Sequence, residues 1–155
     1  MTNYMKTAID EAVTGMNAGH GGPFGAVIVQ NGEIIASAHN EVLLTNDPTM
    51  HAEVNAIRKA CAKLGRFSLH DCEIYSTCMP CPMCLGAIMW AKIPRLYYGA
   101  TAADAADAGF DDDYIYDFIK TDFADERKLS LEIIDADECR GLFSEWADKS
   151  DRNMY

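Results

Sequence analysis

The chain has 155 residues (17.1 kDa), which suits a single domain, and its 49% hydrophobic residues and five prolines exclude a disordered or fibrous protein. Acidic residues outnumber basic ones by 24 to 13, and the resulting net charge of −11 disfavours a polyanionic partner such as a nucleic acid. Residues 101–155 carry 16 of the acidic side chains, whereas residues 1–100 carry eight acidic and seven basic ones. A ligand of the first two thirds therefore need not be charged.

The sequence predicts a cytoplasmic protein without a membrane partner. No apolar run approaches the roughly 18 residues that a membrane span requires. Residues 1–6 lack the basic region, apolar stretch and cleavage site of a secretory signal. Cysteines in a reducing compartment are not expected to pair. Three of the six, Cys78, Cys81 and Cys84, fall within seven residues, which favours metal binding instead.

The first predicted elements are a helix and a β-hairpin. Apolar residues from position 5 to position 16 recur at three- and four-residue spacing, which predicts a helix that ends before Gly19. Residues 26–29 form a short, apolar run that suits a buried strand. Asn31 and Gly32 are typical of a type I′ turn, so residues 33–38 should return antiparallel to the first strand.

Two further helices are predicted in the middle of the chain, each followed by a strand. Asp47 and Pro48 suit the N-cap and first position of a helix, which Gly65 should end. Residues 73–77 read as a strand, Pro80 and Pro82 open the next helix, and residues 95–98 form another strand.

The remaining residues complete the predicted fold. Residues 102–113 fit a loop or a frayed helix, residues 129–134 a fifth strand, and residues 137–149 an amphipathic helix. This order predicts an α/β protein, a three-layer α/β/α sandwich around a mixed five-stranded sheet. We expect one domain over residues 1–155, with residues 150–155 as a tail. Trp90 and Trp146 have apolar neighbours at helical spacing and are expected in the core.

Two segments carry metal-binding chemistry: His51-Ala52-Glu53 and residues 80–84, which contain Cys81 and Cys84. Cysteines three apart share one face of a helix, and thiolates with an imidazole suit zinc, so His51 would be the third ligand. Because successive residues turn by about 100°, His51 and Glu53 can face one site only in the first turn of a helix. The metal should therefore lie at a helix N-terminus, where free N–H groups stabilise thiolates.

Three other interpretations compete with an open zinc site. An iron–sulfur run would need a fourth cysteine where Ile88 stands. Cys78 could complete a closed structural zinc site, which would leave Glu53 without a role. His51 could also merely cap its helix while the cysteines lie in the core, although two matched segments argue against this.

An open site has a chemical consequence. Three protein ligands leave one position for water, whose pKa falls to near 7 on zinc. Glu53 is then the natural proton carrier, since H-x-E with P-C-x-x-C is the signature of zinc-dependent nucleobase deaminases with glutamate as the general acid/base.

The sequence resembles the cytidine deaminase superfamily in this signature. The resemblance extends to residues 21–29, 46–53 and 81–88. Residues 104–115, with Gly109-Phe110-Asp111-Asp112, and a final tyrosine resemble the bacterial guanine deaminases within it. The resemblance implies a cytidine deaminase-like fold, one zinc ion per chain, hydrolytic deamination of guanine to xanthine and ammonia, and a homodimer with a swapped C-terminal segment. It also implies four substrate contacts: Asn40 binding the purine, Phe24 packing near it, Asp112 beside it, and Tyr155 closing the pocket in its own or the partner subunit.

The substrate contacts also have simpler interpretations. Asn40 could be a turn residue, Phe24 a core residue, Asp112 part of a solvated acidic run, and Tyr155 a disordered chain end.

Other substrates stay open at this point. Met79 stands where many relatives carry glutamate, which removes an acid from the surroundings of the metal. The alternatives are deamination of cytosine, adenine, guanosine or a triazine-like heterocycle, and a non-catalytic binding module with a structural zinc. A tRNA adenosine deaminase shares the His-Ala-Glu pattern, but binding RNA calls for a basic surface.

Overall fold

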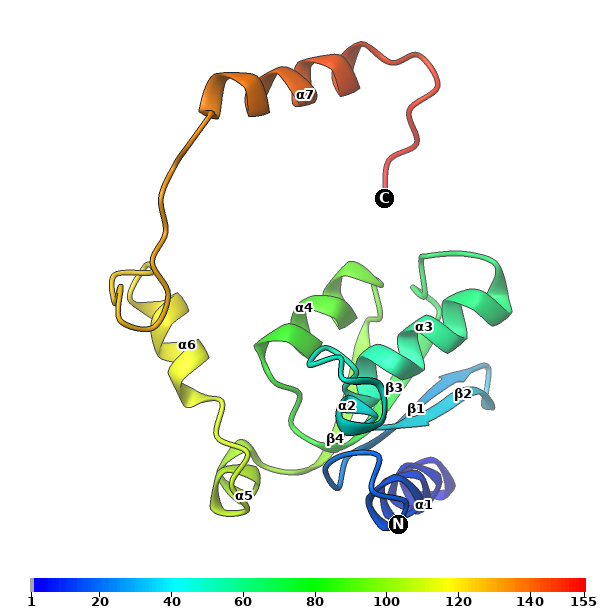
Figure 1. Ribbon diagram of the computed structural model, residues 1–155. Helices are drawn as coiled ribbons and strands as arrows, with labels where there is room; N and C mark the ends of the chain where they lie inside the picture. The colour runs from blue at the N-terminus through cyan, green and yellow to red at the C-terminus, as the bar shows by residue number, and fades with distance from the viewer. Residues whose placement is uncertain (1) are drawn as a thin grey trace. The chain divides into compact units, whose positions relative to one another are not determined.

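The computed structural model describes residues 2–155, which form two compact units, one ending at Asp112 and the other spanning Asp113–Tyr155 (Figure 1). The first unit contains α1 (Asn3–Asn17), β1 (Gly25–Gln30), β2 (Glu33–His39), α2 (Val42–Thr45), α3 (Ala52–Leu64), β3 (Cys72–Cys78), α4 (Pro82–Trp90), β4 (Arg95–Ala100) and α5 (Ala102–Asp107). The second contains α6 (Asp113–Lys120) and α7 (Ala136–Asp148).

The four strands form one mixed sheet in the order β2-β1-β3-β4. β1 pairs antiparallel with both β2 and β3, and β3 pairs parallel with β4. The turn between β1 and β2 has φ of 51° at Asn31 and 82° at Gly32. Two consecutive positive φ angles are those of a type I′ turn, so the predicted hairpin is confirmed.

Side chains of β1 alternate between two cores, one on each face of the sheet. Val27 and Val29 pack with Ala8 of α1, whereas Ala26 and Ile28 pack with the residues of α3 and α4. Gly25 allows α1 to approach closely, because a Cβ there would lie 1.9 Å from the Ala8 carbonyl oxygen. The first unit is therefore the predicted three-layer α/β/α arrangement, with α1 below the sheet and α3 and α4 above it in Figure 1.

The prediction of a fifth strand was wrong. Residues 129–134 pair with no strand in the described chain, residues 2–155, and their apolar side chains are exposed, to 91% for Ile133. A run of β-forming residues makes a strand only when a sheet edge accepts it, and that pairing is a non-local contact.

The predicted start of the second helix was also wrong. α3 begins at Ala52, with His51 as its N-cap. The Asp47 carboxylate instead accepts hydrogen bonds from the backbone N–H (2.8 Å) and the hydroxyl (2.7 Å) of Thr49. Asp47 therefore closes a local turn, which is the other structure that aspartate side chains favour.

The second unit buries little apolar surface. Phe118 of α6, at 9% exposure, is the one buried hydrophobic residue of 113–155, and it contacts Phe123 at a ring distance of 5.5 Å. The expectation of buried tryptophans was wrong: Trp146 of α7 is 40% exposed, and Trp90, in the first unit, is 69% exposed. All six cysteines are free, and no helix within residues 2–155 could cross a membrane.

Candidate metal centre and its surroundings

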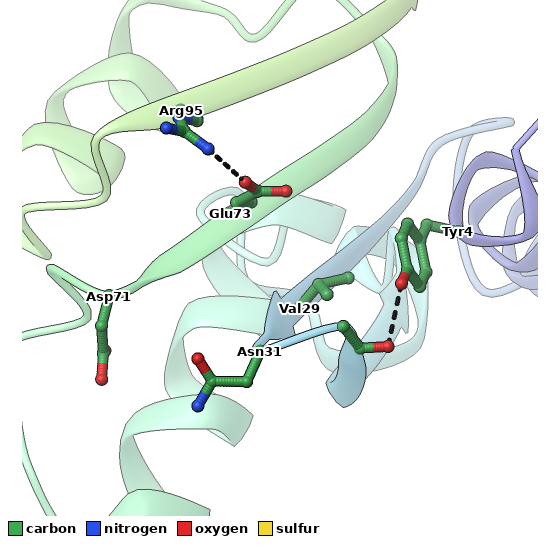
Figure 2. Close-up of a pocket in the computed structure, with 7 residues that line it drawn as sticks. Tyr4, Val29, Asn31, Asp71, Glu73 and Arg95 are labelled. Carbon is green, nitrogen blue, oxygen red and sulfur yellow. Dashed lines mark hydrogen bonds and ion pairs between the residues drawn. The ribbon is translucent and has the colours of Figure 1, made fainter.

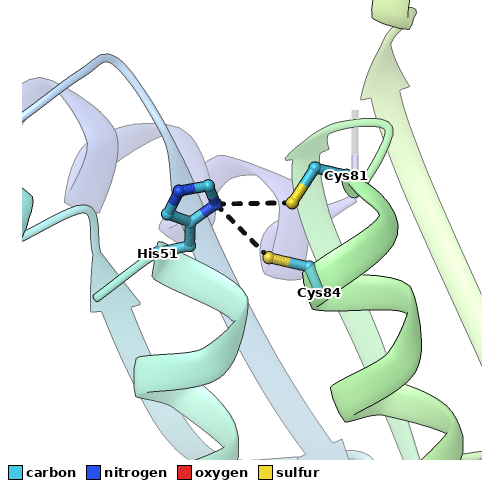
Figure 3. Close-up of side chains that lie close together, drawn as sticks. All are labelled: His51, Cys81 and Cys84. Carbon is cyan, nitrogen blue, oxygen red and sulfur yellow. Dashed lines mark hydrogen bonds between the residues drawn. The ribbon is translucent and has the colours of Figure 1, made fainter. Parts of the chain in front are cut away.

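Three predicted metal ligands meet between the first turns of α3 and α4 (Figure 3). His51 Nδ1 lies 3.6 Å from Cys81 Sγ and 3.5 Å from Cys84 Sγ. A tetrahedral zinc ion with bonds of about 2.3 Å to sulfur and about 2.05 Å to nitrogen separates these ligand atoms by about 3.6 Å. The spacing of the three side chains therefore fits zinc.

Local structure fixes these ligands at two helix ends. His51 is the N-cap of α3 and Cys81 the N-cap of α4, both in extended conformations, and Pro82 at the first position of α4 favours that start. Cys84 lies one turn inside α4 and is buried. His51 and Glu53 both lie at the start of α3, where the irregular first turn allows the two side chains to approach the same region.

The contacts of the two sulfur atoms favour a thiolate at Cys81. A hydrogen bond from the Cys84 thiol lowers the pKa of Cys81 to about 4, and the same contact raises the pKa of Cys84. The hydrogen bond with Cys81 raises the pKa of His51. One thiolate is therefore already present at neutral pH, which is the form that a metal ion binds.

Cys78 is not part of this cluster. Its thiol points to the carbonyl oxygen of Thr101 (Sγ···O 3.4 Å), and burial raises its pKa. Within residues 2–155, the group of close donors around His51 contains Cys81 and Cys84 and no third cysteine. This arrangement supports the open site over the closed zinc site and over the iron–sulfur cluster.

Glu53 is buried beside the ligands. The residue is 5% exposed. Its Oε1 accepts a hydrogen bond from Ser76 Oγ (2.9 Å), and its Oε2 accepts one from the Cys84 thiol (3.4 Å). Burial raises the pKa of Glu53. A carboxyl group with a raised pKa exchanges protons more readily near neutral pH, as a general acid/base must.

Two polar residues beside the cluster, Ser76 and Asn55, were not among those predicted from the sequence. Both are buried polar residues, at 2% and 4% exposure. Asn55 donates from Nδ2 to the His39 carbonyl (3.3 Å), and its backbone N–H bonds to the His51 carbonyl (2.9 Å). The sequence feature that could have identified them is a single polar residue on the core face of a strand or a helix. Such a residue needs a hydrogen-bond partner when it is buried.

Asn40 is buried and directly follows His39, whose carbonyl accepts the hydrogen bond from Asn55. Its backbone N–H donates to the Phe24 carbonyl (3.0 Å), and its Oδ1 accepts a hydrogen bond from the Val42 N–H (3.2 Å). The residue is 5% exposed. The side-chain oxygen therefore closes a local turn just before α2, while the amide nitrogen remains a donor.

Phe24 packs against the segment 109–112, which contains Asp112. The Phe24 ring packs edge-on against Phe110, with centroids 4.9 Å apart and an angle of 84°. Asp112 is half-buried, and its charge contributes to the raised pKa of His51. Tyr155 belongs to the second unit and is 72% exposed. Asp112 is thus close enough to His51 to influence it, and the substrate roles of Phe24, Asp112 and Tyr155 stay predictions.

A separate pocket lies by the β1–β2 turn (Figure 2). Tyr4 donates to the Gly32 carbonyl (2.8 Å), and Arg95 donates to Glu73 (2.9 Å). None of the sequence-predicted site residues lines this pocket. It is therefore distinct from the metal centre.

Comparison with known proteins decides the family. Residues 1–100 match the cytidine and deoxycytidylate deaminase zinc-binding region. The chain belongs to this family. It is similar to a guanine deaminase of Bacillus subtilis (strain 168), with 49% identity over 98% of this chain and 97% of that protein. An X-ray structure of guanine deaminase from Bacillus subtilis resembles the whole fold, with a TM-score of 0.94, 48% identity, and coverage of 100% of this chain and 99% of that chain.

A second group of relatives is similar over a shorter region. A tRNA-specific adenosine deaminase of Aquifex aeolicus (strain VF5) is 42% identical over 63% of this chain and 64% of that protein. The cytidine deaminase-like fold is thereby confirmed, with four strands in place of five.

Proposed function

We propose that this protein converts guanine and water to xanthine and ammonia, with one zinc ion per chain held by His51, Cys81 and Cys84. The extent of similarity carries this proposal, because a guanine deaminase matches 98% of the chain and a tRNA-specific adenosine deaminase only 63%. The net charge of −11 also disfavours an RNA substrate.

Zinc would supply the nucleophile, since a bound water has a pKa near 7 and yields hydroxide at neutral pH. The 3.5 and 3.6 Å spacings of the ligand atoms support zinc at this position.

Glu53 moves the protons of the reaction. It accepts a proton from the attacking water as oxygen bonds to C2 of guanine, and it delivers that proton to N3. Glu53 then takes the proton of the new hydroxyl group on C2 and delivers it to the amino group on C2. The C2–N bond then breaks, ammonia leaves, and C2 becomes a carbonyl of xanthine. The hydrogen bond from Ser76 supports this role, because it holds one oxygen of the carboxylate and leaves the group oriented.

Three residues of the first unit bind the purine. Asn40 Oδ1 is used by the Val42 N–H, so the Asn40 amide donates to O6 or N7 of guanine. Asp112 accepts a hydrogen bond from a ring N–H, and Phe24 packs against the base. Tyr155, from its own or the partner subunit, closes the pocket.

The proposed assembly is a cytoplasmic homodimer with a swapped C-terminal segment. Its support is exposed apolar surface of the kind that a second copy covers: Phe143 and Leu142 of α7 are 75% and 65% exposed, and Met89 of α4 is 76% exposed.

A substrate panel tests the activity. The purified, zinc-loaded protein should deaminate guanine in a spectrophotometric assay. Guanosine, adenine, cytosine and triazine-like heterocycles are assayed separately as alternative substrates. Glu53→Gln should lower kcat by at least about 100-fold and leave the zinc content unchanged. Turnover of another compound with guanine inert would refute the substrate, and full activity of Glu53→Gln would refute the mechanism.

The role of Asp112 has a matched control in its neighbour Asp111, which is exposed. Asp112→Asn should raise KM for guanine about tenfold, because a hydrogen bond from a ring N–H to an ionised carboxylate becomes a weaker one to a neutral amide oxygen. Asp111→Asn should change it less than about twofold. Equal effects of the two substitutions would mean that only the negative charge of the segment matters.

A further inference from the structure

Beside Asn40 lies a row of polar side chains that the proposed reaction does not use. Glu11 of α1 accepts hydrogen bonds from Ser37 Oγ (2.5 Å) and from His39 Nδ1 (2.9 Å). His39 Nε2 in turn lies 3.0 Å from Nδ1 of His20, in the loop after α1. The side chain of His39 is only 12% exposed. Glu11, His39 and His20 thus form a continuous hydrogen-bonded row, called here the histidine row.

Donor and acceptor roles in the histidine row follow from its carboxylate end. An ionised carboxylate only accepts hydrogen bonds, so His39 carries a hydrogen on Nδ1. In neutral His39 the other nitrogen, Nε2, is then an acceptor, and the 3.0 Å contact requires His20 to donate from Nδ1. Glu41 is the other carboxylate near His39, at 3.7 Å from Nε2, which is too long for a hydrogen bond.

The backbone of His20 is fixed as firmly as its ring. Its N–H donates to the Gly15 carbonyl of α1 (2.9 Å), and its carbonyl accepts from the N–H groups of Leu43 (3.0 Å) and Leu44 (3.1 Å). Its ring lies at an angle of 28° to that of His39, with centroids 5.2 Å apart. His20 therefore joins α1, the end of β2 and the start of α2.

The residue after His20 touches Asn40 directly. A Cβ on Gly21 would lie 1.9 Å from Asn40 Oδ1 and 2.9 Å from the Asn40 carbonyl oxygen. The backbone of the loop is thus one wall of the space that holds the Asn40 side chain. On the other side, the Asn40 N–H is bonded to the Phe24 carbonyl. A shift of His20 would move Gly21, and with it the amide of Asn40.

The geometry points to His39 and His20 as positioning residues: the histidine row, anchored on Glu11, holds the loop at Gly21 against Asn40 and so aims the Asn40 amide at the substrate. This inference rests on the proposed function, because it assigns Asn40 to substrate binding. A positioning residue of this kind affects binding of the base rather than the proton transfers at Glu53.

Two substitutions of His20 separate positioning from bulk. In His20→Asn the side-chain amide nitrogen can occupy the place of Nδ1 and still donate to His39, whereas His20→Leu has similar bulk and no donor. With the zinc-loaded protein, His20→Leu should raise KM for guanine about tenfold and change kcat less than about twofold, the pattern of lost uniform binding. His20→Asn should restore KM to within about threefold of wild type. His70→Leu, in an exposed histidine bonded to Ser68, is the matched control and should leave both constants unchanged.

A second readout needs no substrate. Long-range ¹H–¹⁵N correlation of the imidazoles in the zinc-loaded protein should show neutral His39 and neutral His20 both with hydrogen on Nδ1. The signal of His39 should change in His20→Leu and stay near its wild-type position in His20→Asn. Circular dichroism of each variant checks that it is folded.

The outcomes are distinguishable from failure of the proposed function. If wild type turns over no guanine, the proposed function fails first, and the kinetic arm uses whichever base of the panel is turned over. If wild type is active but His20→Leu has an unchanged KM, or His20→Asn is no better than His20→Leu, the positioning role is wrong. A hydrogen on Nε2 of neutral His39, with Nδ1 bare, would overturn the histidine row itself.

Discussion

The two units of this chain differ in how they use apolar residues. The unit ending at Asp112 buries them on both faces of a four-stranded sheet, in cores that include Ile28 and Val27 at 0% exposure. In the unit Asp113–Tyr155, only Phe118 is buried, while Ile133, Phe143 and Met154 are more than 70% exposed. The second unit also carries 12 acidic and six basic side chains.

This contrast shows that sequence composition alone does not decide burial. Residues 113–155 contain many apolar side chains, but they form no sheet against which their helices could pack these side chains. Burial of apolar side chains within these 43 residues therefore contributes little to their stability. The proposed metal ligands His51, Cys81 and Cys84, in comparison, all belong to the first unit.

The largest effect should come from the metal ligands. Cys81→Ala should lose zinc and all measurable activity, because two remaining ligands hold the ion weakly. Cys78→Ala, in a thiol bonded to the Thr101 carbonyl, should keep about one zinc per chain. Metal analysis of the purified variants decides this. Loss of zinc in Cys78→Ala would return Cys78 to the set of ligands.

Core substitution tests the contrast between the units directly. Ile28→Ala removes a fully buried side chain and should lower the free energy of unfolding by about 2–5 kcal/mol. Ile133→Ala, at 91% exposure, should lower it by less than about 0.5 kcal/mol. Urea denaturation measures both. A loss at Ile133 close to that at Ile28 would mean that Ile133 is buried in the protein in solution.

The proposed dimer offers a third comparison, on one helix. Phe143→Asp replaces an exposed apolar side chain of α7 and should raise the dimer dissociation constant at least about tenfold, equivalent to about 1.4 kcal/mol. Ser144→Asp adds the same charge at the next position and should have little effect. Analytical ultracentrifugation over a range of concentrations measures both. A wild-type monomer at micromolar concentration would exclude the dimer altogether.

The smallest expected effect is the pH dependence that Glu11 contributes. Burial raises its pKa, but hydrogen bonds from Ser37 and His39 and the nearby charge of Lys59 outweigh burial, so the pKa lies below its ordinary value of 4.5. A carboxylate of this kind stabilises the fold above its unfolded pKa, and this contribution is lost as the pH falls through the folded value.

Denaturation of wild type and Glu11→Gln at about pH 6 and about pH 3.5 checks this sign. Wild type should lose more stability on acidification than Glu11→Gln does. Glu33→Gln, in an exposed glutamate of β2, is the control and should behave as wild type. An identical loss in Glu11→Gln would contradict the assigned shift of the Glu11 pKa.

Local patterns predicted the first unit well. The Asn31–Gly32 turn, the strands and the end of α3 at Gly65 follow from residues close in sequence, and so does the spacing of Cys81 and Cys84. Contacts between distant segments were beyond the sequence. The partner of Glu53 comes from β3, and the histidine row joins α1, a loop and β2.

The errors have the same cause. Residues 129–134 had the composition of a strand, but no local feature says whether a sheet edge will accept them. Asp47 could cap either a helix or a turn, and the neighbouring Thr49 decided for the turn by supplying two donors. Trp90 has apolar neighbours in sequence, yet it lies on the outer side of α4, at 69% exposure.

Two of the proposed ligands, His51 and Cys81, are the N-caps of helices whose starts are 30 positions apart along the chain. The two sulfur atoms, three residues apart, come together when α4 forms, whereas the imidazole reaches them only once α3 and α4 have both docked on the sheet. The ion would then bind late in folding and join the N-termini of the two helices, so that zinc content would report completed folding. A strong chelator should destabilise these two helix starts before it disturbs the rest of the sandwich.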